Sequence, residues 1–408
     1  MYQQRAEALA FDQAQALGVT IVMPCLNETI SLPHCIANAQ DALRMIEDRY
    51  GLAGEIVIAD NGSTDGSQAL AESLGARVVP VARRGYGAAL IGGCQAAYGD
   101  YILMGDCDGS YNFVEGVAMI GKLIDGHDLC MGSRFDGGIA PGAMPWKNRH
   151  IGNPALTGIL NLFFRSGIND AHCGLRAISR DAFAKLGLSG EGMEFASEMV
   201  IKASLKKMRV VQLPATLSVD LRDRAPHLRP WRDGWRHLRY LLMLSPTWVF
   251  GVPAMAALGA GSVILVLALL HLLGVTDGES RFGASWMIAA GFLVSVGHLS
   301  AIMALATHFH GVNCGYRSLR PLIRRYAGYL TLETMLAAGV VMLVASGTAI
   351  AAIVYYWSQT GFSALASVLP TVTALTGATI AIQTILGGFL LAIINGHRAT
   401  LIPDNEPR

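Results

Sequence analysis

The sequence predicts an α/β domain, with a mostly parallel sheet and helices on both faces, followed by an α-helical transmembrane domain of four spans. Short apolar segments alternate with helix-like segments up to about residue 217, a pattern typical of strand–helix–strand units. Beyond residue 246, four long apolar runs contain no Asp, Glu, Lys or Arg. With 408 residues, the chain is long enough to hold both parts.

Strands are expected where short apolar runs are bounded by polar or glycine residues. These runs are Val19–Cys25, Glu55–Asp60, Ala76–Val81, Tyr101–Asp106 and Leu129–Phe135. The helix-like stretches between them include Leu32–Ile46, Gln68–Leu74, Gly87–Tyr98 and Phe113–Leu123. Sheets of this kind bind ligands at the carboxyl ends of their strands, so the residues that follow each strand are the first candidates for a site.

Polar clusters follow three of these strands, namely Asn27-Glu28, Asp60-Asn61-Gly62-Ser63 and Asp106-Cys107-Asp108. Residues i and i+2 of a strand point the same way, so Asp106 and Asp108 are expected to converge on one cation. Carboxylate oxygens suit Mg²⁺ or Mn²⁺, which leave coordination positions open for substrate phosphates. The sequence therefore predicts one shared divalent-metal and phosphate site at this edge of the sheet.

The four apolar runs are long enough to cross a bilayer, which takes about 20 residues. They are Val249–Leu273, Ala284–Thr307, Met335–Trp357 and roughly Ala364–Ile394, with Pro370 marking the start of the last span. The loop between the second and third spans holds a clear excess of positive charge, with four arginines, which places it in the cytoplasm by the positive-inside rule. No apolar signal region precedes the first domain, so we expect an integral protein of the cell (inner) membrane whose catalytic domain is cytosolic.

Two stretches beside the membrane have a helical apolar rhythm interleaved with arginines. In His227–Ser245 the apolar residues recur every three or four positions, and Tyr316–Leu330 repeats this pattern. Both are predicted to be amphipathic helices in the headgroup plane, where they either gather an anionic lipid head or only seat the domain on the bilayer. The predicted organisation is a cytosolic domain at 1–226, an amphipathic helix at 227–246, membrane helices at 247–396 with a cytosolic amphipathic segment at 308–332, and a cytosolic tail at 397–408.

Charge and cysteine content exclude other classes of protein. The net charge of +1 argues against a partner nucleic acid. The seven cysteines show no metal-ligand spacing and are expected to be buried thiols in a reducing compartment. A transporter with a nucleotide-binding regulatory domain stays a remote alternative, because the spans lack the charged residues that ion paths need and the first domain lacks a Gly-Lys-Ser/Thr phosphate loop.

Several motifs together resemble one enzyme family. Val22–Glu28, Ile58–Ser67 and the Asp106 motif, in that order, resemble family 2 glycosyltransferases of the GT-A fold. Gly132–Phe135, Cys173–Arg176 and Asp223-Arg224, followed by membrane spans, are similar to the dolichol- and polyprenyl-phosphate sugar synthases. The tail is similar to that of bacterial polyprenyl-phosphate glycosyltransferases with four membrane helices. The resemblance covers residues 19 to about 230.

The resemblance implies roles for individual residues. Nucleotide-binding roles fall on Pro24, Asn27, Glu28, Asp60, Asn61, Asp106 and Cys107. Metal-binding roles fall on Asp106 and Asp108, and catalytic roles fall on Asp106, Asp108, Arg134, Arg149, Arg224 and Glu194. The sequence departs from the family pattern at Asn61, which replaces the second acid of a common Asp-Asp pair, and at Ser110, where some relatives have a metal-ligating Gln.

The resemblance implies transfer of a sugar from a nucleotide-sugar donor to a polyprenyl (undecaprenyl or dolichyl) phosphate, metal-dependent and with inversion. A lipid phosphate is already an anionic nucleophile and needs no general base. The alternative acceptor is a lipid hydroxyl of the diacylglycerol or sphingoid type, for which Glu194 would be the base. A processive polymer synthase is disfavoured because no Gln-x-x-Arg-Trp motif is present, and a homo-oligomer is left open.

Overall fold

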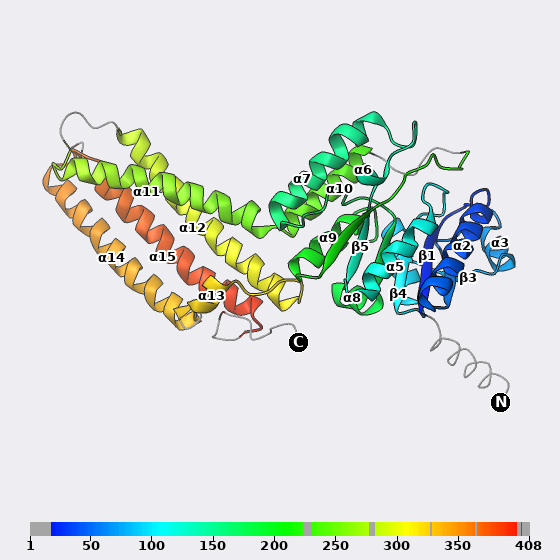
Figure 1. Ribbon diagram of the computed structural model, residues 1–408. Helices are drawn as coiled ribbons and strands as arrows, with labels where there is room; N and C mark the ends of the chain where they lie inside the picture. Colours follow the sequence, from blue (N-terminus) through cyan, green and yellow to red (C-terminus); the bar gives the residue numbers. More distant parts are fainter. Residues whose placement is uncertain are drawn as a thin grey trace. The chain divides into compact units, whose positions relative to one another are not determined.

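The computed structural model describes residues 18–223, 230–276, 282–326, 329–363, 365–397 and 401 (Figure 1). The chain divides into two compact units, with the boundary between Leu244 and Ser245. Unit 1 is an α/β domain and unit 2 is a set of long helices. Each unit is described here by itself.

Unit 1 is built on a seven-stranded sheet with the order β3-β2-β1-β4-β6-β5-β7. The strands are β1 (Val19–Cys25), β2 (Gly54–Asp60), β3 (Arg77–Pro80), β4 (Tyr101–Met104), β5 (Leu129–Ser133), β6 (Arg176–Ser179) and β7 (Val210–Pro214). All are parallel except β6, which runs antiparallel between β4 and β5. The mostly parallel sheet predicted from the sequence is confirmed.

Helices cover both faces of the sheet, as predicted. In chain order they are α2 (Leu32–Tyr50), α3 (Ser67–Ser73), α4 (Tyr86–Gln95), η1 (Phe113–Glu115), α5 (Gly116–Ile124), α6 (Arg134–Gly137), η2 (Asn148–Gly152), α7 (Asn153–Phe164), α8 (Arg180–Leu186), α9 (Phe195–Leu205) and α10 (Pro230–Met243). Alternate residues of β1 explain the two layers. Ile21 and Met23 pack with α2 and α5, whereas Val22 faces α4, where a Cβ on Gly93 would lie 2.6 Å from the Val22 side chain.

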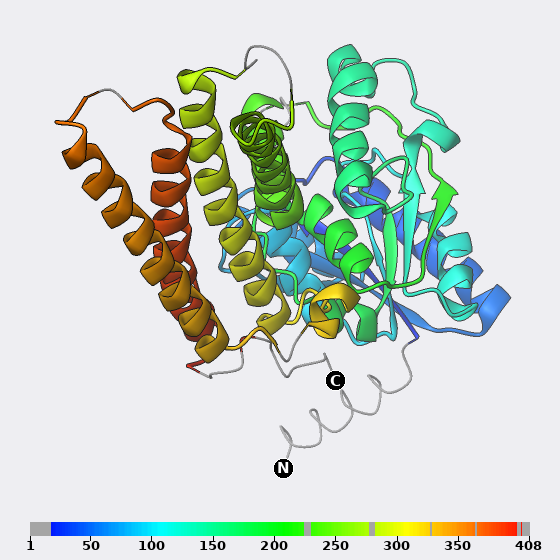
Figure 2. The same ribbon diagram turned by 90° about the vertical axis from the view of Figure 1, so that its left-hand side faces the viewer.

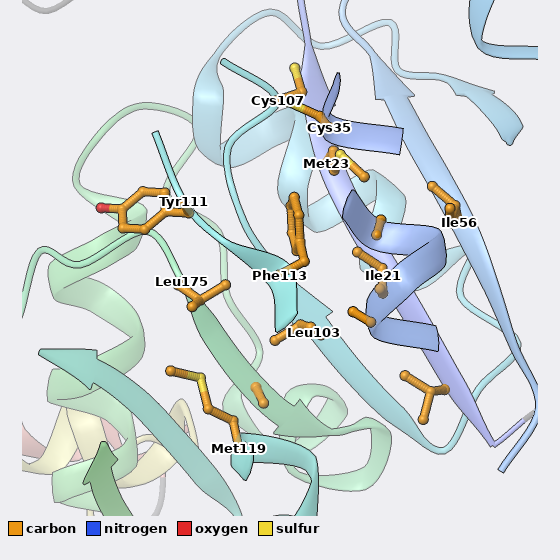
Figure 3. Packing of buried hydrophobic residues seen from close by; sticks show 14 of the residues in the cluster. Ile21, Met23, Cys35, Ile56, Leu103, Cys107, Tyr111, Phe113, Met119 and Leu175 are labelled. Atoms are coloured by element: carbon orange, nitrogen blue, oxygen red, sulfur yellow. The ribbon is translucent and has the colours of Figure 1, made fainter. Parts of the chain in front are cut away.

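The main core lies between the sheet and the layer of α2 and α5 (Figure 3). Ile21, Met23 and Ile56 of the strands belong to this core together with Phe113, and all four are almost fully buried. α2 has a proline in its first turn, where the lack of an N–H group costs no helical hydrogen bond. It ends at Gly51, which adopts a positive φ of 69°. This core supports the carboxyl ends of β1, β2 and β4, where the polar loops begin.

The predicted strands differ from the observed ones mainly at their ends. β1 has the predicted bounds, but β4 ends at Met104, two residues before the expected Asp106. β6 and β7 complete the sheet, and neither strand is among those predicted from the sequence. β6 is only four residues long and contains Arg176, so it lacks the continuous apolar run of a central parallel strand.

The described residues of unit 2 include four helices of membrane-spanning length and composition, as predicted (Figure 2). After η3 (Thr247–Gly251) come α11 (Val252–Leu272), α12 (Ala284–Asn313), α13 (Pro321–Arg325), α14 (Leu332–Gln359) and α15 (Leu369–Ile394). α11, α12, α14 and α15 pack side by side, and small residues allow close approach, since a Cβ on Gly377 would lie 2.5 Å from the Ser346 hydroxyl. α15 has Pro370 in its first turn, where the sequence placed the start of the span.

The predicted amphipathic helix over Tyr316–Leu330 needs correction. α12 continues to Asn313, through the first residues of the expected segment at 308–332, and the only helix between it and α14 among the described residues is the five-residue α13. Pro321 explains the late start, because a proline disfavours helical geometry at the residue before it, and Arg320 is extended with ψ of 139°.

Candidate active site

A cavity of about 550 Å³ lies at the carboxyl ends of β1, β2 and β4, a size that suits a small-molecule ligand. The cavity is lined by the loops after these strands and by the start of α4. The residues before α9, the segment between β7 and α10, and α10 itself complete the lining. Its lining consists of Pro24, Cys25, Leu26, Glu28, Asn61, Arg84, Gly85, Tyr86, Ala89, Asp106, Cys107, Asp108, Gly192, Met193, Arg222, Arg232 and Arg236. Six of the residues predicted from the sequence are among them: Pro24, Glu28, Asn61, Asp106, Cys107 and Asp108.

Asp106 and Asp108 lie in a turn after β4 and not inside the strand, which corrects the geometry expected from their spacing. The Asp108 Oδ1 atom accepts hydrogen bonds from the Ser110 N–H (2.9 Å) and hydroxyl (2.6 Å), and Gly109 adopts a φ of 81°. The turn, and not strand periodicity, is what brings both carboxylates to the cavity. Ser110 therefore supports Asp108 directly.

Asp106 is half-buried, and one of its two carboxylate oxygens is shielded from solvent. Its carboxylate has a hydrogen bond with Tyr86, but its Oδ1 atom has no hydrogen-bond partner. Burial, together with the charge of Asp108, raises the pKa of Asp106 to about 6. Gly174 allows this placement, because a Cβ there would lie 2.7 Å from Asp106 Oδ2. A buried carboxylate oxygen without a donor is a position suited to a cation or a substrate hydroxyl.

Arg222 is the main cationic partner of the carboxylates, and the sequence did not single it out. Its guanidinium forms an ion pair with Asp108 and lies 3.7 Å from Glu28 Oε1. The segment that carries it runs along the turn after β4, since Leu221 N–H donates to the Asp108 carbonyl (2.8 Å). This pairing of distant segments leaves no local signal in the sequence.

The hydrogen bonds of Asn61 explain why an amide stands where the family pattern has an acid. Its Nδ2 donates to the carbonyls of Val81 (3.1 Å) and Arg83 (2.6 Å), and its Oδ1 accepts from Gly85 N–H (2.7 Å). An aspartate has no N–H to donate, so the amide is the side chain that these carbonyls require. Asn61 thereby fixes the segment that carries Arg84 into the cavity.

Asp60 and Asn27 support the loops and do not line the cavity. Asp60 accepts hydrogen bonds from the backbone of Gly62 (3.0 Å) and from Gln68 Nε2 (2.6 Å). Asn27 has a φ of 59°, and its Oδ1 accepts from Thr64 N–H (2.7 Å). Their nucleotide-binding roles stay predictions, and what the structure adds is a role in shaping the β1 and β2 loops.

Two of the three predicted catalytic arginines, Arg134 and Arg149, lie away from the lining. Arg134 forms a bidentate ion pair with Asp170, at 2.7 and 2.8 Å, and is buried. Arg149 lies exposed in η2, and Arg224 lies outside the described residues. In their place Arg84, Arg222, Arg232 and Arg236 bring positive charge to the cavity. Of these, Arg232 and Arg236 belong to the stretch His227–Ser245, which the sequence predicted to be an amphipathic helix beside the membrane.

Glu194 lies at the start of α9, next to the lining residues Gly192 and Met193. Its Oε1 accepts from Gly192 N–H (3.1 Å), and its buried Oε2 atom has no hydrogen-bond partner. Its catalytic role stays a prediction, with one oxygen available to accept a proton or a hydrogen bond.

This sheet topology, with carboxylates and arginines at its carboxyl edge and four membrane-length helices behind it in sequence, defines a membrane glycosyltransferase of the GT-A type. The chain belongs to the family 2 glycosyltransferases. Residues 20–187 match "Glycosyl transferase family 2", and residues 305–395 match "Glycosyltransferase family 2 C-terminal transmembrane region".

One curated relative matches nearly the whole chain, and two others match about half of it. The low-salt glycan biosynthesis hexosyltransferase Agl6 of Haloferax volcanii is 35% identical over 94% of this chain and 90% of its own length. A dolichyl-phosphate hexose transferase of the same organism is 26% identical over 51% of this chain and 84% of its own. The polyprenol monophosphomannose synthase of Mycolicibacterium smegmatis is 27% identical over 48% of this chain and 76% of its own.

Proposed function

We propose that this enzyme transfers a hexose from a nucleotide-sugar donor to a polyprenyl phosphate, with inversion and with a divalent metal, at the cytosolic face of the membrane. The observation that carries the proposal is a single cavity that combines the carboxylates of Glu28, Asp106 and Asp108 with four arginines. Such a set suits a ligand that is both metal-bound and polyanionic. The names of the dolichyl-phosphate and polyprenol relatives support the lipid class.

The residues present fit a divalent metal. Asp106 offers a buried carboxylate oxygen that has no donor, and Asp108 lies two residues away in the same turn. Within the described residues no three His, Cys, Asp or Glu side chains could hold an ion together, which suits an ion whose remaining ligands are donor phosphates and water. When bound, Mg²⁺ or Mn²⁺ would neutralise charge on the nucleoside diphosphate leaving group.

The arginines supply the rest of the electrostatic stabilisation. Guanidinium groups match phosphate oxygens in a bidentate way and keep their charge at any physiological pH. Arg84 enters from the Asn61-supported segment, and Arg232 and Arg236 enter from α10. Arg222 pairs with Asp108 and Glu28, so it balances these two carboxylates and orients them toward the cavity.

The acceptor decides whether a base is required. An ionised lipid phosphate attacks the anomeric carbon without losing a proton, so positioning and charge suffice. A lipid hydroxyl is the second candidate acceptor, and one observation favours it: the buried Glu194 Oε2 atom has no donor and could take a proton. The positive charge of the cavity favours the phosphate, because a neutral hydroxyl gains little from it.

The test uses the full chain, purified in detergent, with a panel of labelled nucleotide sugars. We expect transfer to polyprenyl phosphate, none to the matching polyprenol, and only a modest loss in Glu194→Gln. A hydroxyl acceptor would instead make Glu194→Gln lose about 10²–10⁴ in rate, the usual cost of removing a base. Equal use of polyprenol, or collapse of activity in that variant with the fold preserved, would transfer the proposal to the hydroxyl acceptor.

A further inference from the structure

We propose that Cys25 and Cys107 form a reversible oxidation site inside the candidate active site, in which a peroxide joins the two thiols in a disulfide and blocks the cavity to its substrate. The disulfide itself follows from the geometry of unit 1. Its effect on turnover rests on the function proposed above.

The strand register brings the two cysteines together. β1 and β4 are parallel and paired from Val19 opposite Tyr101 to Val22 opposite Met104. Continuing this register by three residues places Cys25 opposite Cys107. Neighbouring strands are about 4.8 Å apart, which lies within the Cα separation of about 4.4–6.8 Å that disulfides span.

Hydrogen bonds beyond the paired residues show that the segments following β1 and β4 stay adjacent as far as Cys107. The Gly105 N–H donates to the Val22 carbonyl (3.3 Å), and the Cys107 thiol donates to the Pro24 carbonyl (2.7 Å). The two thiols also influence each other, since Cys107 lowers the pKa of Cys25 and Cys25 raises the pKa of Cys107. No large backbone movement is therefore needed to bring one sulfur onto the other.

Access separates this pair from the other thiols. Cys25 and Cys107 line the cavity, so a small oxidant in the cavity can reach them although each is at most 3% exposed. Cys35 lies near Cys107 in the core but does not line the cavity (Figure 3). Cys94, Cys130 and Cys173 are buried elsewhere, and Cys314 is exposed in unit 2. Oxidation by a reagent that enters the cavity should therefore select the pair.

The reaction balances with hydrogen peroxide as the oxidant. One thiol attacks the peroxide, its sulfur becomes a sulfenic acid, and one water leaves. The second thiol then attacks that sulfur, the S–O bond breaks, and a second water leaves. Two thiols and one peroxide thus give one disulfide and two waters. A dithiol reductant restores both thiols and is itself oxidised to a disulfide.

The disulfide would act on the site through Cys107, which stands between Asp106 and Asp108. Joining it to Cys25 breaks the hydrogen bond from the Cys107 thiol to the Pro24 carbonyl and displaces Cys25 from Ser63, 3.8 Å away. Because the turn carries this sulfur as well as both carboxylates, we expect even a small displacement of the sulfur to change the positions of Asp106 and Asp108. We expect weaker binding of any ligand that needs Asp106 and Asp108 together.

The first experiment maps the disulfide without reference to activity. The full chain in detergent is treated with stoichiometric hydrogen peroxide, alkylated, digested without reduction and analysed by mass spectrometry. We expect a Cys25–Cys107 cross-linked peptide that is lost in Cys25→Ser and in Cys107→Ser but retained in Cys130→Ser. Oxidation confined to Cys314, or a Cys35–Cys107 link, would overturn the site.

The second experiment measures Mn²⁺ binding by the loss of the free-ion signal in electron paramagnetic resonance. We expect the affinity of the wild type to fall at least about tenfold on oxidation and to recover with dithiothreitol, whereas Cys25→Ser should show no change on oxidation. Unchanged Mn²⁺ affinity in the cross-linked protein would overturn the blocking effect. If reduced protein binds no Mn²⁺, the metal in the proposed function is wrong, while the mapped disulfide still stands.

Discussion

The two units use apolar side chains in opposite ways. In β1 of unit 1, six of seven residues are buried, whereas Gly339 is the one buried residue of the 28 in α14 of unit 2. Only 6% of the most apolar window of α14 is buried within the protein. Water drives the burial in unit 1, but a helix this apolar and this exposed requires lipid as its solvent. Apolar side chains thus form a core in one unit and a membrane-facing surface in the other.

Charge is divided in the same way. Unit 1 buries ion pairs such as Arg134–Asp170 and Glu198–Lys202, whose side chains are at most 10% exposed. In the described part of unit 2, Glu333 is the single carboxylate. The chemistry of a polyanionic donor therefore belongs to unit 1, and unit 2 offers arginines near its helix ends. The predictions below test this division, beginning with the largest effect.

Removal of one carboxylate from the turn after β4 should have the largest effect on turnover. Asp108→Asn is expected to lower the transfer rate roughly 10³-fold, because it removes charge where the donor phosphates bind. EDTA should do the same to the wild type. The matched control is Asp65→Asn, which makes the same change at an exposed loop carboxylate that binds Thr29 and Ser67. Full turnover of Asp108→Asn, or of wild type in EDTA, would exclude the metal.

Cysteine labelling tests the side of the membrane on which the arginine loop of unit 2 lies. Cys314 is the one exposed thiol among the described residues, so an impermeant maleimide reports on it in the wild-type protein. We expect no labelling in intact cells and full labelling after permeabilisation. In a Cys314→Ser background, Thr276→Cys should label from outside. The reverse pattern would separate the proposed site from a cytosolic nucleotide sugar.

Arg222 should matter less than Asp108 but more than any arginine outside the cavity. Arg222→Ala is expected to lower turnover about 10–100-fold, the cost of about 1.5–3 kcal/mol for losing a charged hydrogen bond. Arg222→Lys should recover part of this, since it keeps the charge without the guanidinium fork. Arg149→Ala is the control at an exposed position. Steady-state kinetics of the three variants decides the order, and an Arg149→Ala loss above that of Arg222→Ala would restore the prediction from the sequence.

How far the sequence predicts this site depends on whether the signal is local. The apolar run Val19–Cys25 and the polar residues after it gave β1 and the position of Glu28 correctly, because both follow from the alternation of strands and helices. Arg222 could not be found in this way, since its place depends on the pairing of Leu221 with Asp108, far apart in the chain. Arg134 was predicted to be catalytic, but its guanidinium is bound to Asp170. This partner lies 36 residues away, and no motif in the sequence links the two residues.

Asn61 provides a smaller effect that tests the supporting loops. Asn61→Asp is expected to lower stability by about 1–3 kcal/mol, because the carbonyls of Val81 and Arg83 would face a carboxylate in place of their donor. The apparent Tm of the full chain measures this loss. Asn148→Asp introduces the same charge outside the cavity and should leave Tm nearly unchanged. An Asn61→Asp protein as stable as the wild type would contradict the role of the amide.

The smallest effect concerns His172 of unit 1, which contacts the α9 residue Ser197 that is hydrogen-bonded to His237 of α10. His172 Nε2 lies 3.2 Å from the Ser197 hydroxyl, which in turn lies 2.8 Å from His237 Nδ1. Desolvation, together with the nearby His237, Arg134 and Arg176, holds the pKa of His172 well below its usual 6.5. Below about pH 6.5 the His172 imidazole is therefore protonated in the unfolded chain but stays neutral in the folded protein. The free energy of unfolding consequently decreases as the pH falls.

Replacing His172 should remove this acid sensitivity. Between pH 6.5 and 5.5 the linkage is worth at most about 1.4 kcal/mol, or a few degrees in apparent Tm. We therefore expect the fall in Tm from pH 7.5 to 5.5 to be smaller in His172→Gln than in the wild type. His34→Gln is the control, because His34 is exposed and should leave the pH dependence as it is. If His172→Gln loses as much Tm on acidification as the wild type does, the acid sensitivity of unit 1 arises from another group.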